Sequence, residues 1–92
     1  MPAKITVNKS DEETYGVRVS EGKSESTHTV ALKSADYKRL SGEKISPAEL
    51  IRRSFEFLLE HEPKESILAS FDLTVISRHF PNYEREIKSR LA

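Results

Sequence analysis

The amino-acid sequence predicts an α+β fold, with a three-stranded antiparallel β-meander over about residues 3–33 followed by four or five helices. In the first third of the chain apolar and polar residues alternate, which is typical of strands with one buried face. From residue 34 onward the apolar residues recur at intervals of three and four, which is typical of amphipathic helices. We expect a single domain over residues 1–92, with a meander (1–33) and a helical part (34–92), because this length supplies one modest core.

Three alternating stretches separated by two polar turns make up the predicted meander. In the third stretch His28, Val30 and Leu32 point inward, and the intervening residues point outward. Gly22 supplies the glycine that a tight reversal before this stretch needs. The three stretches are KITVNK (4–9), TYGVRVS (14–20) and THTVALK (27–33).

The strongest helix signal covers about residues 47–61. Ser46 is expected to cap the first turn, Pro47 suits the first helical position, and Glu49 completes a Ser-x-x-Glu capping box. The apolar residues cover an arc of roughly 200° around this helix, about twice the stripe of a surface helix. We therefore expect the helix to pack across the inward face of the sheet and to contact other elements as well.

Two short helices are predicted beside this main helix. Before it, Ser34 is the expected cap of a helix that ends at Gly42. After it, the spacing of Ile67, Leu68 and Phe71 predicts about two turns of helix.

The end of the chain is expected to form two more helices. Asp72 can cap the first of them, which ends before the next proline. Asn82 can cap the second, whose apolar face comprises Tyr83, Ile87 and Leu91.

The inward strand residues and the apolar helix faces together form the predicted core. Only 36% of the residues are apolar, so we expect this core to be small and its stability to be marginal. The predicted core residues are Tyr15, Val17, Val19, Val30, Leu32, Ile51, Phe55, Leu58, Leu59, Leu68, Phe71, Ile76 and Phe80.

Charge is balanced along the chain. There are 15 basic and 15 acidic residues, and each half of the chain is close to neutral. We therefore expect no strong attraction to nucleic acid or to an anionic membrane. No apolar run approaches the ~18 residues of a membrane span and no signal peptide is recognised, so a cytoplasmic location is expected. The absence of cysteine excludes disulfides, thiol catalysis and cysteine-ligated zinc.

The chemically reactive residues form no recognisable catalytic or metal-binding pattern. The histidines, His28, His61 and His79, fall in different predicted elements, and we interpret them as structural. There is no Gly-x-Ser-x-Gly elbow, and the glycines are isolated rather than clustered in a phosphate-binding loop. We predict no catalytic residue, no cofactor, no metal and no enzymatic activity. The alternative, a small enzyme or metal protein, requires two of the three histidines to converge.

The predicted helix over residues 47–61 favours a binding role, because it is broadly apolar in a chain with few apolar residues and no catalytic pattern. We predict a non-enzymatic protein-interaction or regulatory module. The expected partner is another protein or a second copy of this chain, and no membrane is involved.

One stretch supports a different hypothesis. Residues 27–59, which read THTVALK, then SADYKRLSG, then ISPAELIRRSFEFLLE, resemble the ribbon-helix-helix family of dimeric DNA-binding repressors and antitoxins. In that family a strand from each subunit pairs into a ribbon that enters the major groove. The resemblance implies a DNA contact surface made of the outward strand residues Thr27, Thr29, Ala31 and Lys33. The whole chain also resembles small bacterial proteins that end in short amphipathic helices.

Overall fold

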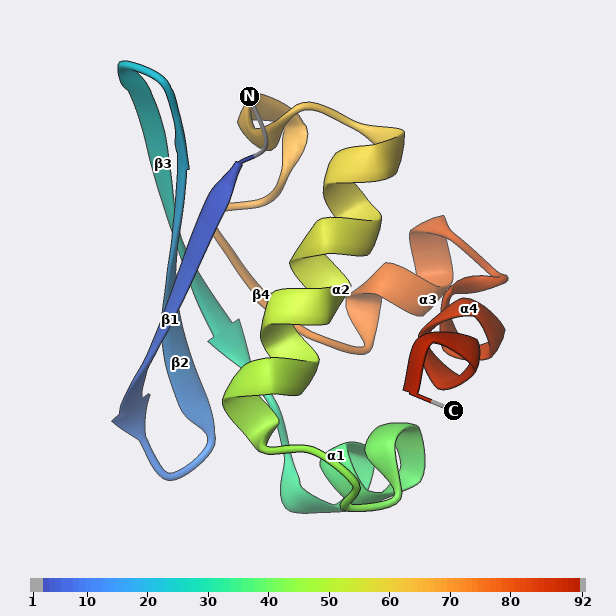
Figure 1. Ribbon diagram of the computed structural model, residues 1–92. Helices are drawn as coiled ribbons and strands as arrows, with labels where there is room; N and C mark the ends of the chain where they lie inside the picture. The colour runs from blue at the N-terminus through green and yellow to red at the C-terminus, as the bar shows by residue number, and fades with distance from the viewer. Residues whose placement is uncertain (1–2, 92) are drawn as a thin grey trace.

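The computed structural model describes residues 3–91 and shows a four-stranded sheet with helices on one side of it (Figure 1). The strand order follows the chain, β1-β2-β3-β4; the first three strands are antiparallel, and β4 runs parallel to β3. The α+β prediction is confirmed, although the sheet is mixed and contains a strand beyond the predicted meander. The strands are β1 (Lys4–Asp11), β2 (Thr14–Glu21), β3 (Ser24–Ala31) and β4 (Ser70–Asp72). The helices are α1 (Ser34–Ser41), α2 (Pro47–His61), α3 (Val75–His79) and α4 (Tyr83–Leu91), with one 3-10 turn, η1 (Lys64–Ser66).

The meander forms because alternate side chains of its strands share one buried face. β2 pairs with β1 on one edge and with β3 on the other, so that Val17 lies between Val7 and His28. Tyr15, Val17 and Val19 are at most 5% exposed. The predicted three-stranded antiparallel meander is therefore present, but its third strand covers Ser24–Ala31 and not residues 27–33, because the chain leaves the sheet to enter α1, whose N-cap is Lys33.

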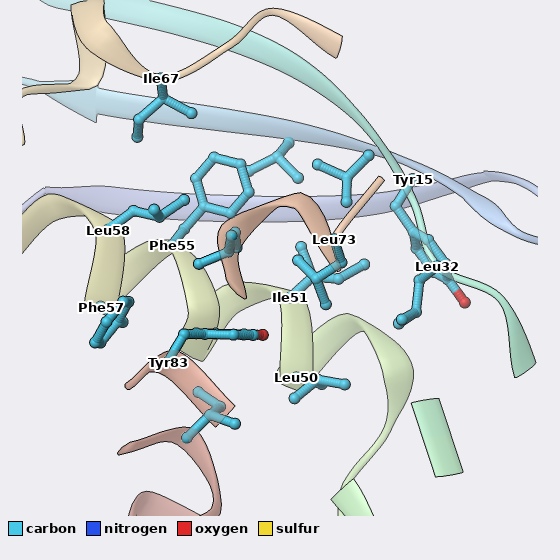
Figure 2. Close-up of a cluster of buried hydrophobic side chains, with 14 of the residues drawn as sticks. Tyr15, Leu32, Leu50, Ile51, Phe55, Phe57, Leu58, Ile67, Leu73 and Tyr83 are labelled. Atoms are coloured by element: carbon cyan, nitrogen blue, oxygen red, sulfur yellow. The ribbon is translucent and has the colours of Figure 1, made fainter. Parts of the chain in front are cut away.

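α2 lies between the sheet and α4, and this position explains its wide apolar arc (Figures 1 and 2). On the sheet side, the ring of Phe55 lies 5.4 Å from the ring of His28. On the α4 side, the ring of Phe57 lies 5.5 Å from the ring of Tyr83, and the hydroxyl groups of Ser54 and Tyr83 are 2.6 Å apart. The same helix thus joins two layers of the core.

The start of α2 matches its sequence signal in part. The hydroxyl of Ser46 accepts a hydrogen bond from the backbone N–H of Glu49 at 3.1 Å, as predicted. The carboxylate of Glu49 accepts hydrogen bonds from Arg52 and Arg53 along the helix rather than closing the capping box. These hydrogen bonds, chiefly those from Arg52, lower the pKa of Glu49 to about 2.

The prediction of a helix at residues 67–71 is wrong, because the chain is extended at Ile67 and enters the sheet as β4 from Ser70. The backbone N–H of Thr29 donates to the carbonyl oxygen of Ala69 at 2.7 Å, and that of Leu73 donates to Ala31 at 2.9 Å. A helix of about two turns has little stability of its own, so pairing with β3 satisfies the backbone better.

Two smaller differences concern the helix caps. Ser34 is the first residue of α1 rather than its cap, and its N–H donates to the carboxylate of Glu13 at 3.2 Å. Asp72 does not cap α3 directly; its carboxylate accepts from the N–H of Thr74 at 2.9 Å and closes the turn before the helix. The predicted stop of α1 at Gly42 is confirmed by a left-handed φ of 62°.

The core runs from the sheet through α2 to α4 (Figure 2). Leu59, Phe71 and Phe80 are only partly buried, whereas Leu68, which was predicted to be in the core, is 52% exposed. The side chain of Leu91 lies outside those that the structure describes. The predicted core residues that are buried are Tyr15, Val17, Val19, Val30, Leu32, Ile51, Phe55, Leu58 and Ile76, and the core also contains Leu40, Leu50, Phe57, Ile67, Leu73, Tyr83 and Ile87.

Candidate interaction groove

An apolar groove of about 300 Å³ lies between the C-terminal half of α2, the segment after η1, β4 and α3. Most of its lining is apolar, and Glu62, Ser66 and His79 contribute polar groups. We call this feature the groove. Its apolar lining residues are Leu58, Ile67, Leu68, Phe71, Val75, Ile76 and Phe80.

Buried anchors hold the chain segment that forms one side of the groove. Ile67 precedes β4, Leu73 follows it, and Ile76 lies on α3; each is at most 7% exposed. Between these anchors β4 is fixed to β3 by backbone hydrogen bonds. The position of the groove is therefore set by the sheet and not by a flexible loop.

His28 of β3 fixes the chain at Leu68. Its Nδ1–H donates to the carbonyl oxygen of Leu68 at 2.8 Å. Because a carbonyl oxygen only accepts, Nδ1 carries a proton, and Nε2 is hydrogen-bonded to the hydroxyl of Ser26 at 2.8 Å. The carbonyl of Leu68 is thus held against the sheet while its side chain remains 52% exposed at the groove.

Aromatic packing supports the groove from behind. The ring of Phe71 lies 6.0 Å from the ring of Phe55, which is fully buried. The ring of Phe80 lies 5.7 Å from that of Phe57 and 5.1 Å from that of His61. Rings packed in this way have preferred relative orientations, so the apolar surface is part of the folded core and not of a loose loop.

Glu62 is the one carboxylate among the lining residues. Its neighbours are paired, because Glu60 accepts from Arg90 at 2.7 Å and Glu65 accepts from Lys64 at 2.5 Å. Within residues 3–91, the half-buried side chain of Glu62 has no hydrogen bond or ion pair of this kind. The groove therefore places a carboxyl group that no residue of the described range 3–91 pairs with beside an apolar surface.

Of the residues that the family resemblance singled out, Thr27 and Thr29 lie on the other, open face of the sheet, whereas Lys33 lies beyond the end of β3. Thr27 and Thr29 are exposed and border a shallow hollow of about 420 Å³ together with Arg18. Lys33 is exposed at the start of α1 and does not line this hollow, and Ala31 is half-buried. The structure thus brings two of the four predicted residues together at the hollow.

β3 has a neighbouring strand on both of its edges. β2 pairs with it from Ser24 to Ala31, and β4 pairs with it from Thr29 to Ala31. A ribbon that used residues 29–31 of the β3 strands of two subunits would therefore have to displace β4.

The titratable and hydroxyl groups inside the fold act as structural links. Both ring nitrogens of His28 are used in hydrogen bonds, and no three His, Asp or Glu side chains within residues 3–91 could hold a metal ion. The hydroxyl of Ser54 donates to the carbonyl of Leu50 at 2.8 Å, so Tyr83 donates to Ser54. Burial raises the pKa of Tyr83 to about 12, which keeps this donor protonated.

Sequence-based reasoning assigned no binding role to the residues of the groove. The sequence nevertheless contains a signal for an extended strand in this segment, because Ser66 and Ser70 flank the apolar pair Ile67 and Leu68. An apolar run this short between polar residues is as consistent with a buried strand as with a helix. The role of Glu62 follows only from the three-dimensional arrangement.

The function of this chain can be inferred only from its sequence and geometry, because it has no detectable similarity to known proteins. No protein-family model, no curated protein and no solved structure matches this chain. Among the helices that the structure describes, none combines the length and the apolar character needed to cross a membrane.

Proposed function

We propose that this chain is a non-enzymatic protein-interaction module that binds its partner through the groove. The observation that supports this function is a preformed apolar groove beside Leu68, whose side chain is 52% exposed. Covering Leu68 and the exposed part of Phe71 would remove apolar surface from water, which favours association. The partner is another protein or a second copy of this chain.

The incomplete burial of apolar residues in a chain that has few of them also favours a binding role. Only 36% of the residues are apolar, yet Leu68, Phe71 and Phe80 are not fully covered. Burying them more completely would stabilise the fold. Apolar surface that stays uncovered although its burial would stabilise the fold is typical of an interaction site.

The proposed function can be tested by affinity capture with the wild-type chain and a Leu68→Lys variant. Proteins are captured under mild salt from the cells that produce this chain, and each recovered protein is purified for calorimetric titration against both forms. We expect Leu68→Lys to weaken binding by at least about tenfold, because the complex would have to desolvate an ammonium group.

Thr6→Lys is the matched control. It adds the same charge at an exposed position of β1, on the open face of the sheet, and leaves the groove unchanged. An equal loss of binding in the two variants, or the absence of any reproducibly captured protein, would contradict the proposed function.

A second candidate function is that of a dimeric DNA-binding regulator or antitoxin of the ribbon-helix-helix type. The exposure of Thr27 and Thr29 beside Arg18 on the open face supports it. This candidate predicts that Thr29→Ala and Lys33→Ala weaken DNA binding without unfolding the chain, and that the affinity falls steeply with salt. Light scattering over a micromolar concentration range is the first measurement, because a persistent monomer cannot form a ribbon between two chains.

A further inference from the structure

The outer edge of β4 carries main-chain groups that the fold does not use. The N–H of Thr29 bonds to the carbonyl of Ala69, and the alternation of a parallel ladder then directs the main-chain groups of Phe71 toward β3. The N–H and C=O groups of Ser70 and Asp72 consequently point away from β3. No other backbone hydrogen bond among residues 3–91 uses these groups.

This edge borders the groove. The side chain of Phe71 shares the inner face of the sheet with Val30, contacts Phe55 and lines the groove. Side chains alternate between the two faces of a sheet, so a strand added beside β4 would place every second side chain on this inner face. Those side chains would lie next to Phe71, where the groove is.

The opposite edge of the sheet, β1, is less suited to strand addition. It carries exposed Lys4 and Lys9, and its register shifts between Lys9 and Asp11. Lysines and irregularities of this kind protect edge strands from pairing. β4, with the sequence Ser-Phe-Asp, carries no lysine and no register shift, so its three residues and Asp72 are the features that limit pairing at this edge.

The charge of the groove indicates which side chains a partner segment carries. Glu62 lines the groove as a half-buried carboxylate, and no described residue pairs with it. A lysine or arginine of the partner would supply the missing counter-charge, and the pair would be stronger there than in open water.

We propose that the occupant of the groove is an extended segment of a partner protein that adds to β4 as a fifth strand of the sheet. An apolar side chain of the segment packs against Phe71 and Leu68, and a lysine or arginine of the segment pairs with Glu62. This inference rests on the proposed function, because it specifies the partner that the groove binds.

The experiment uses short peptides selected from a displayed random library on the immobilised full chain. The best peptide is titrated against the wild-type chain, Ser70→Pro, Ser70→Ala, Glu62→Gln and Leu68→Lys. Ser70→Pro removes the outward N–H without removing a hydrogen bond to β3, whereas Ser70→Ala keeps that N–H and serves as its control. Amide hydrogen exchange of the free and bound wild-type chain reports on Ser70 and Asp72 directly.

We expect the selected peptides to alternate apolar and polar residues around a lysine or arginine. Ser70→Pro should weaken binding by about tenfold and Ser70→Ala by much less. The amides of Ser70 and Asp72 should become protected in the complex. Glu62→Gln should weaken binding only for peptides that retain their basic residue.

Peptides that need Leu68 but bind Ser70→Pro as they bind the wild-type chain, without protection at Ser70 and Asp72, would overturn the strand-addition proposal and leave the proposed function intact. Failure to obtain any peptide whose binding depends on Leu68 would contradict both. If Ser70→Pro alters the circular dichroism spectrum, the exchange measurement on the wild-type chain decides the question.

Discussion

The meander and the segment from Glu62 to Phe80 bury their side chains in different ways. In β2, successive inward residues are all buried against the same core. The segment is anchored at separate points, Ile67, Leu73 and Ile76, and the apolar residues between them stay partly exposed. A continuous buried face stabilises a fold, whereas separate anchors fix a segment and still leave apolar surface for a partner.

The difference extends to the backbone. The meander strands are eight residues long and pair with one another along almost their whole length, whereas β4 pairs with β3 over only three residues. Segments with few buried contacts and few protected hydrogen bonds open at a lower free energy than the rest of a domain. We therefore expect the segment to open without unfolding of the meander, and the following substitutions test this expectation.

Phe55→Ala should have the largest effect, because Phe55 joins the two regions. Its ring is fully buried and packs against His28 of the meander and Phe71 of the segment. Removing a buried phenylalanine ring costs about 3–5 kcal/mol, which is a large share of the stability of a small domain. Chemical denaturation of the variant should show both regions unfolding together at much lower denaturant concentration. A loss below about 1 kcal/mol would contradict the packing described for Phe55.

Tyr83→Phe tests the other side of α2 through its pH dependence. Burial raises the pKa of Tyr83 from 10.0 to about 12. The pKa of Tyr83 is higher in the folded chain than in the unfolded chain, so the protonated hydroxyl stabilises the fold fully below pH ~10. As the pH rises toward 12 the free energy of unfolding falls by about 2–3 kcal/mol in all. At neutral pH, Tyr83→Phe should lower the free energy of unfolding by about 1 kcal/mol, because it removes the hydrogen bond to Ser54. The variant should not show the decline in stability at alkaline pH. Parallel alkaline profiles of the two proteins would contradict this account.

The helix α2 shows which parts of the fold were predictable from the sequence. Its predicted range, residues 47–61, agrees with the structure, and its start is set by the signals at Ser46 and Pro47, which act within one helical turn. β4 could not be predicted in this way. Its register depends on β3 and on a hydrogen bond between His28 and Leu68, which are 40 residues apart.

His28→Phe should destabilise the segment from Glu62 to Phe80 and leave the meander largely unaffected. Phenylalanine keeps an aromatic ring next to Phe55 but removes the hydrogen bond to the carbonyl of Leu68. We expect a loss of about 1–2 kcal/mol, concentrated in the segment. Hydrogen exchange should accelerate at the amides of Thr29 and Leu73, which connect β3 to the segment, while β1–β2 amides keep their protection. Uniform acceleration throughout the sheet would show instead that the two regions open as one unit.

The groove could not be predicted for a related reason. Leu68 and Leu73 are identical in type and close in sequence, yet one is 52% exposed and the other is fully buried. The sequence pattern places Leu68 in the predicted core and leaves Leu73 out, which is the reverse of what the structure shows. What distinguishes them is that β4 and His28 hold the backbone on either side, and this constraint comes from tertiary contacts.

Leu68→Lys should have the smallest effect on stability. The side chain is already half exposed, and the bond to His28 uses the backbone carbonyl of Leu68, which the substitution retains. Thermal and chemical denaturation should therefore agree with the wild-type chain within about 0.5 kcal/mol. A larger loss would mean that the leucine side chain supports the fold, and the binding defect of this variant would then no longer report on the groove alone. Unchanged stability with lost binding would identify Leu68 as apolar surface that serves the partner and not the core.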